Sequence, residues 1–317
     1  MAVLGGQKTA VKPKRRSSRT ALQSKQTQLA WLLMLPTIAV VILVAAYPLV
    51  RTFYTSFTDA AFGYRTHFIG WTNLYNVLQD GKFRETVYET FKFALITVPS
   101  EFVLGMGIAL VVNSRFKGRG ALRAAMLVPW AIVTVVNAEM WNLMYNDTYG
   151  VFNDILEKIH WPGAPFAFTS DPTLALGAVS GIDIWKTTPF VALLLLAGLQ
   201  VIPNDVYEAA TVDGASAWQQ FWRITLPLLK PAILVTLIFR TMDALRVFDV
   251  FYVLFGAAPC IPGNCKMSMA VYIQENLVSF AGSPGQIGYG SALSVAVFII
   301  LAVIVAIYVK AIPLERT

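Results

Sequence analysis

The sequence predicts an all-α, polytopic membrane protein, and three observations support this class. The 317 residues are 56% hydrophobic and only 14% charged, with a mean hydropathy of +0.59, whereas soluble domains carry about 25% charged residues. Long apolar segments recur along the chain between polar stretches. Each is about 20 residues or more, which is enough to cross a hydrocarbon core of about 30 Å.

Six segments meet this criterion. The expected transmembrane helices are residues 29–50, 93–112, 124–145, 173–201, 231–255 and 287–309. Several contain a proline or an isolated charge, so we expect a packed bundle rather than separate anchors. Residues 1–28 are then a basic, disordered tail and residues 29–312 a six-helix transmembrane domain, interrupted by a polar segment at 203–227.

The distribution of lysine and arginine predicts the orientation. The N-terminal tail, the loop after the second segment, the region after the fourth and the C-terminus together hold fifteen basic residues, against seven in the remaining loops. The richer side is expected to be cytoplasmic, with both termini inside. A nucleic-acid arm would also be basic, but a tail that helps to fix topology explains this composition, and no nucleic-acid partner is expected.

The first segment contains Tyr47-Pro48 and leads into Ser56-Phe57-Thr58-Asp59. Pro48 is expected to bend or end the helix nearby, because proline lacks a backbone N–H. The outer loop that follows carries the aromatic stretch Phe68-Ile69-Gly70-Trp71-Thr72-Asn73-Leu74. Anchoring at the membrane interface is its simplest interpretation.

Acidic residues lie inside the second and third segments, at Glu101 and Glu139. Acids within membrane helices face a bundle interior or water, so each is either a helix-packing partner or part of a pathway. The tight basic turn at residues 113–120 is typical of a cytoplasmic hairpin. The next outer loop, residues 146–172, is rich in proline and aromatic residues and suits either an extracytoplasmic protein or lipid headgroups.

Polar residues recur on the fourth and fifth segments. Asp183, Thr187 and Phe190 are spaced i, i+4 and i+7 and share one helix face. Asp183 lies about ten residues into its segment, roughly 15 Å deep and near the midplane. Arg240 and Asp243 reach a similar depth on the fifth segment.

Two interpretations of these charges are open. An ion-pair ladder is one, because Lys186 can pair with Asp183 at i+3. The alternating charges of the fifth segment fit the same idea; they are Arg240, Asp243, Arg246 and Asp249. The other is a polar cavity wall, in which carboxylates accept ligand hydroxyls, arginine donates and Phe190 or Trp185 provides a flat face.

The polar segment at 203–227 predicts a compact helix-turn-helix. Pro203-Asn204-Asp205 is a turn-and-cap cluster that can start a short helix, and Gly214 is where that helix can stop. Residues 215–223 form a second short helix, and Pro227 marks the expected start of the next long helix. An ordinary helical loop is the simplest interpretation, although its small residues permit close approach by a partner.

The spacing inside this segment is more specific. It consists of Glu208-Ala209-Ala210, three residues, Gly214, nine residues, Ile224, one residue and Leu226-Pro227. This pattern resembles the EAA loop of the membrane subunits of ABC importers. In that family the loop is the coupling helix, which seats in a cleft of the ATP-hydrolysing subunit. The resemblance therefore assigns ATPase coupling to Glu208, Ala209, Ala210, Gly214, Ile224, Leu226 and Pro227.

Other stretches extend the resemblance over roughly residues 30–313. Residues 184–190, 243–249 and 287–292 look like helices of the binding-protein-dependent permeases for maltose, trehalose and glycerol-phosphate, most like the first permease of a trehalose or maltose importer. The type I importer permease fold is implied. So is a substrate-binding wall at Asp183, Thr187, Phe190, Arg240 and Asp243. One departure is Gly256-Ala257-Ala258-Pro259, where the family usually has Gly-Gly-Gly-Pro.

The resemblance also implies partners. The chain has no P-loop, since its one Gly-Lys is Gly81-Lys82. We therefore expect a subunit that is not an enzyme and has no cofactor of its own, with ATP and Mg bound by a dimer of ABC ATPase subunits. The other expected partners are a second homologous permease, an extracytoplasmic substrate-binding lipoprotein, a disaccharide such as trehalose or maltose, and the lipids of a bacterial inner membrane.

Two other functional classes are weaker. A proton-coupled secondary transporter would use the intramembrane Asp, Glu and Arg as a relay, but no evident pair of broken helices in inverted repeats supports it. It also leaves the coupling pattern unexplained. A membrane-embedded enzyme would need a catalytic constellation, and the sequence shows none.

The two cysteines, Cys260 and Cys265, flank the turn signal Pro262-Gly263 in a loop predicted to be extracytoplasmic. A disulfide is expected, because that compartment is oxidising. No group of His, Cys and carboxylate residues has metal-ligand spacing, so no metal site is expected.

Overall fold

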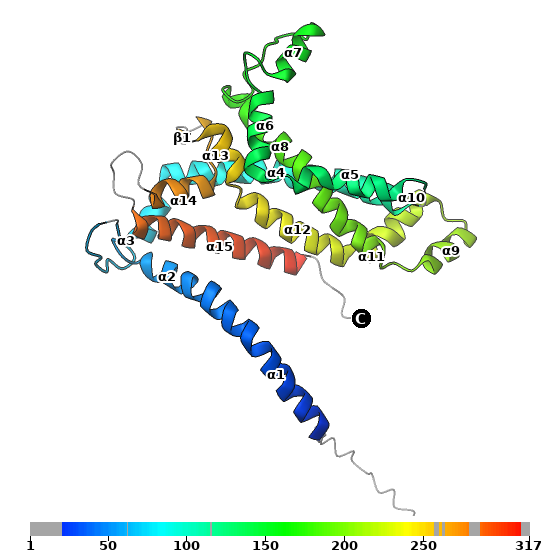
Figure 1. The fold of residues 1–317 in the computed structure, drawn as a ribbon, viewed down its shortest axis with the longest axis horizontal. Coiled ribbons are helices and arrows are strands. Elements are labelled where there is room, and N and C mark those ends of the chain that lie inside the picture. The colour runs from blue at the N-terminus through cyan, green and yellow to red at the C-terminus, as the bar shows by residue number, and fades with distance from the viewer. Residues whose placement is uncertain are drawn as a thin grey trace, which may run out of the picture. The chain divides into compact units, whose positions relative to one another are not determined.

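The computed structural model of the protein (Figure 1) describes residues 21–61, 63–114, 116–256, 260–261, 264–278 and 286–311. Most of the predicted basic tail, the Pro262-Gly263 turn and residues 312–317 lie outside this part of the chain. The chain divides into two compact units, residues 1–51 and 52–317.

Helices make up most of the described chain. In order they are α1 (Ala21–Val41), the π-helical turn η1 (Ile42–Ala46), α2 (Tyr47–Thr55), α3 (Thr72–Gln79), α4 (Gly81–Asn113), α5 (Arg119–Ala131), α6 (Thr134–Met144), α7 (Val151–Lys158), α8 (Pro172–Leu199), α9 (Asn204–Val212), α10 (Ala217–Gln220), the π-helical turn η2 (Phe221–Thr225), α11 (Leu226–Leu228), α12 (Lys230–Leu245), α13 (Asp249–Phe255), α14 (Met269–Leu277) and α15 (Ile287–Ala311). Two short strands, β1 (Cys260–Ile261) and β2 (Asn264–Cys265), pair antiparallel. Cys260 lies opposite Cys265 there, and a disulfide joins them.

Four helices are long and apolar enough to cross a membrane in one piece. They are Gln26–Thr55, Gly81–Asn113, Pro172–Leu199 and Ile287–Ala311, and they cover the first, second, fourth and sixth predicted segments. α4 begins at Gly81 rather than at residue 93. Its first turns carry Lys82, Glu89 and Lys92, so a search for apolar runs misses them.

The third and fifth predicted segments are not straight helices. α5 and α6 meet at an angle of 86°, with Ile132 and Val133 between them at ψ of 133°. The fifth segment is interrupted at residues 246–248, between α12 and α13. The stretch Lys230–Phe255 that contains it makes an angle of 68° with the preceding helical stretch Ala217–Leu228. The described residues therefore contain four spanning helices, or up to six if each bent pair forms one span.

Proline is accommodated twice by a π-helical turn. η1 ends two residues before Pro48, and η2 ends two residues before Pro227. In each case the residue before the proline donates its N–H five residues back, from Tyr47 to Ile42 in η1. The backbone is thus already widened where the proline ring meets the preceding turn. Pro48 interrupts the regular helix, but the helix continues to Thr55.

The unit of residues 52–317 is built on α4 and α8, which pack along each other. α12 packs against both, α15 packs against α12 and α3, and α14 packs against α15 and α4. Buried apolar side chains form two clusters in this bundle, one containing Phe93 and Phe251 and the other Leu195 and Leu229.

Hydrogen bonds tie the start of α4 to α14 and α15. The Asp80 carboxylate caps α4 by accepting from the backbone N–H groups of Lys82 and Phe83, at 2.8 and 3.1 Å. Its second oxygen accepts from the hydroxyls of Tyr272 and Tyr289, each at 2.6 Å. Burial raises the pKa of Asp80, but these four hydrogen bonds stabilise the charged form and hold the pKa below its usual value.

Candidate functional site

The segment between α8 and α12 folds as a helix-turn-helix. α9 begins after Pro203, and α10 with η2 forms the second short helix after Ser216. The Ser216 hydroxyl accepts from the Gln219 N–H at 3.3 Å, and the Gln219 side chain accepts from the Ser216 N–H at 2.8 Å, which forms a capping box. The next long helix begins at Lys230 rather than at Pro227, which lies in the single turn α11.

Gly214 forms the turn of this unit and has a φ of +79°. Its N–H donates to the carbonyl of Thr211 at 3.1 Å, and the N–H of Ala215 donates to the carbonyl of Ala210 at 2.9 Å. These two bonds form the Schellman pattern that closes a helix C-terminus. A Cβ at Gly214 would meet no atom within 4 Å, so backbone conformation rather than lack of space favours glycine.

The predicted coupling residues differ in exposure. Glu208, Ala209, Gly214 and Pro227 are exposed, Ala210 is buried, and Ile224 and Leu226 are half-buried. The two short helices are braced by the paired hydroxyls of Tyr207 and Thr225, 3.0 Å apart, and by Gln220 Nε2, which donates to Thr211 Oγ1 at 3.1 Å. Sequence reasoning missed this brace, because neither hydroxyl of the first pair belongs to the motif. The exposed residues of the motif therefore belong to a unit that is held together by hydrogen bonds. This unit is continuous in the chain with α8 and α12.

A buried arginine joins α4, α8 and α12. Arg240 binds Glu101 through Nε and through Nη2, the latter at 2.8 Å. It also donates to Asp183 Oδ2 and to Asp243 Oδ2, each at 2.6 Å. The Thr187 hydroxyl donates to Asp183 Oδ1 at 3.2 Å. The polar residues predicted on the fourth and fifth segments thus meet around one guanidinium.

Burial limits what this cluster can contact. The Arg240 side chain is 1% exposed and that of Glu101 0%, whereas that of Asp243 is 69% exposed. Phe190 lies parallel to Trp130 of α5, with ring centroids 5.7 Å apart, so one of its faces is already covered. Arg240 and Glu101 therefore form an ion-pair network that holds helices together, and Asp243 is the acid in it that is open to a ligand.

Two details of the predicted ladder are wrong. Asp183 pairs with Arg240 instead of Lys186, and Lys186 forms no ion pair with any residue that the structure describes. The alternating charges also do not run along one helix, because α12 ends at Leu245 and Arg246 lies in the break before α13.

Glu101 is the partner of Arg240 that the sequence pattern did not identify. The signal was available, since a buried acid in a membrane helix needs a cation, and Arg240 lies at a similar depth. Glu139, the other acid within a predicted membrane segment, is exposed on α6.

Residues 82–312 match the family described as the inner membrane component of binding-protein-dependent transport systems. The chain belongs to this family. The permease is 41% identical over 295 residues to the trehalose/maltose transport system permease protein MalF of Thermococcus litoralis, covering 91% of this chain and 95% of that protein. It is 40% identical to the sulfoquinovosyl glycerol transport system permease protein SmoG of Agrobacterium fabrum, covering 89% of each.

A solved structure shares the permease's fold. A chain of a bacterial ABC transporter involved in the import of the acidic polysaccharide alginate matches with a TM-score of 0.77 at 23% identity, over 95% of this chain and 100% of that chain. The helical importer permease fold implied by the resemblance is confirmed. Family membership makes the chain an inner-membrane transport component rather than an enzyme, and the proton-coupled alternative finds no support.

Proposed function

We propose that this permease is a transmembrane subunit of an ATP-driven ABC importer that moves a sugar, in particular a disaccharide such as trehalose or maltose, into the cytoplasm. The observation that carries this proposal is the exposed helix-turn-helix between α8 and α12, with Glu208, Ala209 and Gly214 on its accessible surface. A partner that moves this unit also moves two helices of the bundle, because the chain is continuous through them. Relatives named for trehalose/maltose and for sulfoquinovosyl glycerol support a sugar as the substrate class.

The proposed topology has six spans: the four single helices, the bent pair of α5 and α6, and Lys230–Phe255. Both termini and the helix-turn-helix then lie in the cytoplasm, where the basic residues are concentrated. Residues 29–312 form the transmembrane domain, and residues 1–28 a cytoplasmic tail. The disulfide and α7 then lie on the outer side, in an oxidising compartment.

The proposed assembly supplies what this chain lacks. A dimer of ABC ATPase subunits binds ATP and Mg and seats the helix-turn-helix, and a second homologous permease completes the pathway. The binding protein docks on the outer loops, where α7 presents Val151 and Ile155 on one exposed face and Ile159 is exposed directly after the helix. The opposite face of α7 is fixed by Asn153, whose side chain binds the backbone N–H and carbonyl of Phe166, both at 2.9 Å.

Within the membrane we propose that Asp243 contacts the sugar. Its carboxylate is exposed and is also held in place by Arg240. It can therefore accept a hydrogen bond from a sugar hydroxyl. Asp183, which accepts a hydrogen bond from Thr187, holds Arg240 from the other side. Of the wall predicted from the sequence, Asp243 is then the residue that meets substrate, and the buried members position it.

Reconstitution tests this function. The complete complex in proteoliposomes is supplied with labelled trehalose or maltose, the binding protein and ATP, with and without a protonophore. Uptake should require both ATP and the binding protein and should be unchanged by the protonophore. Uptake driven by a proton gradient without ATP would overturn the proposal.

A further inference from the structure

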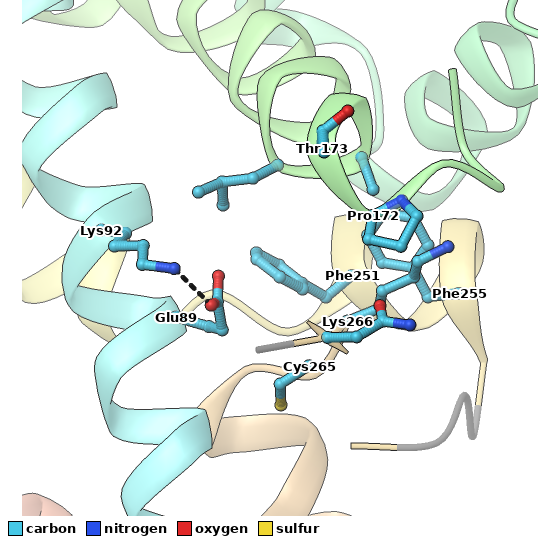
Figure 2. A pocket seen from close by; sticks show the side chains of 11 residues that line it. Glu89, Lys92, Pro172, Thr173, Phe251, Phe255, Cys265 and Lys266 are labelled. Atoms are coloured by element: carbon cyan, nitrogen blue, oxygen red, sulfur yellow. Dashed lines mark hydrogen bonds and ion pairs between the residues drawn. The ribbon is translucent and has the colours of Figure 1, made fainter. Parts of the chain in front are cut away.

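A polar pocket lies at the end of the bundle where α8 begins. Its volume is about 300 Å³, and it is enclosed by α4, the first turns of α8, α13 and the residues at β2 (Figure 2). That volume is at the low end of the range of about 300–1,000 Å³ for small-molecule sites. Glu89 in this pocket and Glu101 in the arginine cluster are separated by about 18 Å along α4, at 1.5 Å rise per residue. The pocket is therefore distinct from the arginine cluster.

One wall of the pocket is an ion pair between a buried glutamate and a half-buried lysine. The Glu89 side chain is 10% exposed, and its Oε1 accepts from Lys92 Nζ at 2.6 Å. Figure 2 shows the carboxylate pointing into the pocket beside that bond. Its second oxygen has no hydrogen-bond partner in the described part of the chain, so it is available to accept from a ligand hydroxyl.

The facing wall is aromatic. Phe251 and Phe255 of α13 line the pocket, with ring centroids 5.9 Å apart and planes at 67°. Figure 2 shows Phe251 between α4 and the start of α8. Apolar and aromatic surface with a few convergent polar groups is the usual composition of a site for an organic ligand. The C–H face of a ligand's saturated ring can pack against such a wall.

Both lysines of the pocket already have acceptors. Lys92 pairs with Glu89, and Lys266 Nζ donates to the carbonyls of Thr169 and Ser170, at 2.9 and 2.5 Å. The carbonyl oxygens leave the charge of Lys266 uncompensated, but both ammonium groups already donate hydrogen bonds within the protein. The second oxygen of Glu89 is an acceptor, so it favours a ligand that donates hydroxyl groups over a sulfonate or a phosphate.

We propose that this pocket binds one ring of a neutral sugar at the predicted outer mouth of the permease, before the sugar reaches Asp243. The inference rests on the proposed function as a sugar permease. A lipid tail would leave the second oxygen of Glu89 without a donor, and an anion would face that carboxylate, whereas a sugar hydroxyl donates to it. The pocket thus supplies an entry subsite for the transported molecule.

Photo-crosslinking tests the subsite directly. The complete transporter in lipid nanodiscs is irradiated with a diazirine derivative of trehalose, digested and analysed by mass spectrometry. Labelled peptides should include residues 89–92 or 251–255, and excess unlabelled trehalose should suppress this labelling. Labelling confined to other segments, while the same complex still takes up trehalose, overturns the subsite and leaves the proposed function intact. Failure of uptake itself overturns both.

A pair of matched variants tests the role of the Glu89 carboxylate. Glu89→Gln keeps the side-chain shape but removes the charged acceptor, and it should reduce labelling of the pocket peptides about tenfold, as expected for a lost hydrogen bond to a charged group. Glu85→Gln makes the same exchange one turn earlier on α4, at a residue that does not line the pocket, so labelling should change less than about twofold. Equal losses in the two variants would refute the subsite.

Discussion

Replacement of Arg240 by methionine decides between a structural and a substrate-binding role for the buried cluster. The guanidinium binds carboxylates from α4 and α8 as well as Asp243 of its own helix. The side chains of Glu101 and Asp183 are 0% and 12% exposed, so both lose their partner in an interior that water barely reaches. Breaking a buried ion pair from one side costs about 3–5 kcal/mol. Arg240→Met should therefore lower both the yield of assembled complex and its thermal unfolding midpoint.

Asp243 provides the matched control in the same cluster. Its side chain is 69% exposed, so Asp243→Asn should cost about 0–1 kcal/mol of stability. Because this acid is open to a ligand, the same variant should lower sugar uptake in proteoliposomes. Size-exclusion chromatography and thermal unfolding of the purified complex report stability, and labelled-sugar uptake reports transport.

A compensating change completes the test. Combining Arg240→Met with Glu101→Met replaces the fully buried pair by apolar groups, which can be nearly neutral in a buried site. It should recover part of the lost stability, because Asp183 still lacks its cation. If Arg240→Met instead assembles and unfolds like the parent while transport is lost, Arg240 belongs to the substrate pathway. The structural interpretation would then be refuted.

Three further predictions concern packing, pH and redox state. A Cβ at Gly105 would lie 2.7 Å from Val191 Cγ1, whereas one at Gly107 would meet no atom within 4 Å. Gly105→Ala should therefore lower the free energy of unfolding by about 1–3 kcal/mol, and Gly107→Ala should leave it unchanged or raise it by up to about 1 kcal/mol. Equal unfolding midpoints for the two variants would contradict this packing. The pKa of Asp80 is lower in the folded protein than in the unfolded chain, where it is about 3.9. Its hydrogen bonds therefore stabilise the fold fully at pH values above the unfolded pKa, and this stabilisation is lost as pH falls through the folded pKa. Unfolding midpoints measured from pH 7 to pH 3 should therefore fall less in Asp80→Asn than in the parent; identical slopes would count against the network. Mass spectrometry of unreduced protein should find Cys260 and Cys265 joined, and two free thiols would reject the disulfide.

The helical membrane class and four of the spans could be predicted because apolar runs report transfer into lipid. The breaks in the other two segments could not. Ile132 and Val133 are as apolar as their neighbours, yet their backbone leaves the helix. Hydropathy is insensitive to such a change, since the side chains stay suited to lipid while the hydrogen-bonding pattern changes.

The two parts of the candidate site differ in how far sequence could reach them. The helix-turn-helix was predictable to within a few residues, because its determinants are local: the Ser216 capping box and the Schellman turn at Gly214. The arginine cluster depends on tertiary packing. Arg240 and Glu101 are 139 residues apart, and only the packing of α12 against α4 and α8 selects Arg240 over Lys186 as the partner of Asp183.

The rate of ATP hydrolysis by the reconstituted complex, with and without sugar-loaded binding protein, tests the coupling role of the helix-turn-helix most directly. Gly214→Val places a β-branched side chain at a φ of +79°, which such residues rarely adopt, whereas Gly214→Asn tolerates it. Glu208→Lys reverses an exposed charge. We predict that Gly214→Val and Glu208→Lys insert normally but lose the ATPase subunit or the stimulation of hydrolysis, while Gly214→Asn keeps both. Full stimulation and full uptake in Gly214→Val and Glu208→Lys would contradict the assignment of this segment as the coupling element.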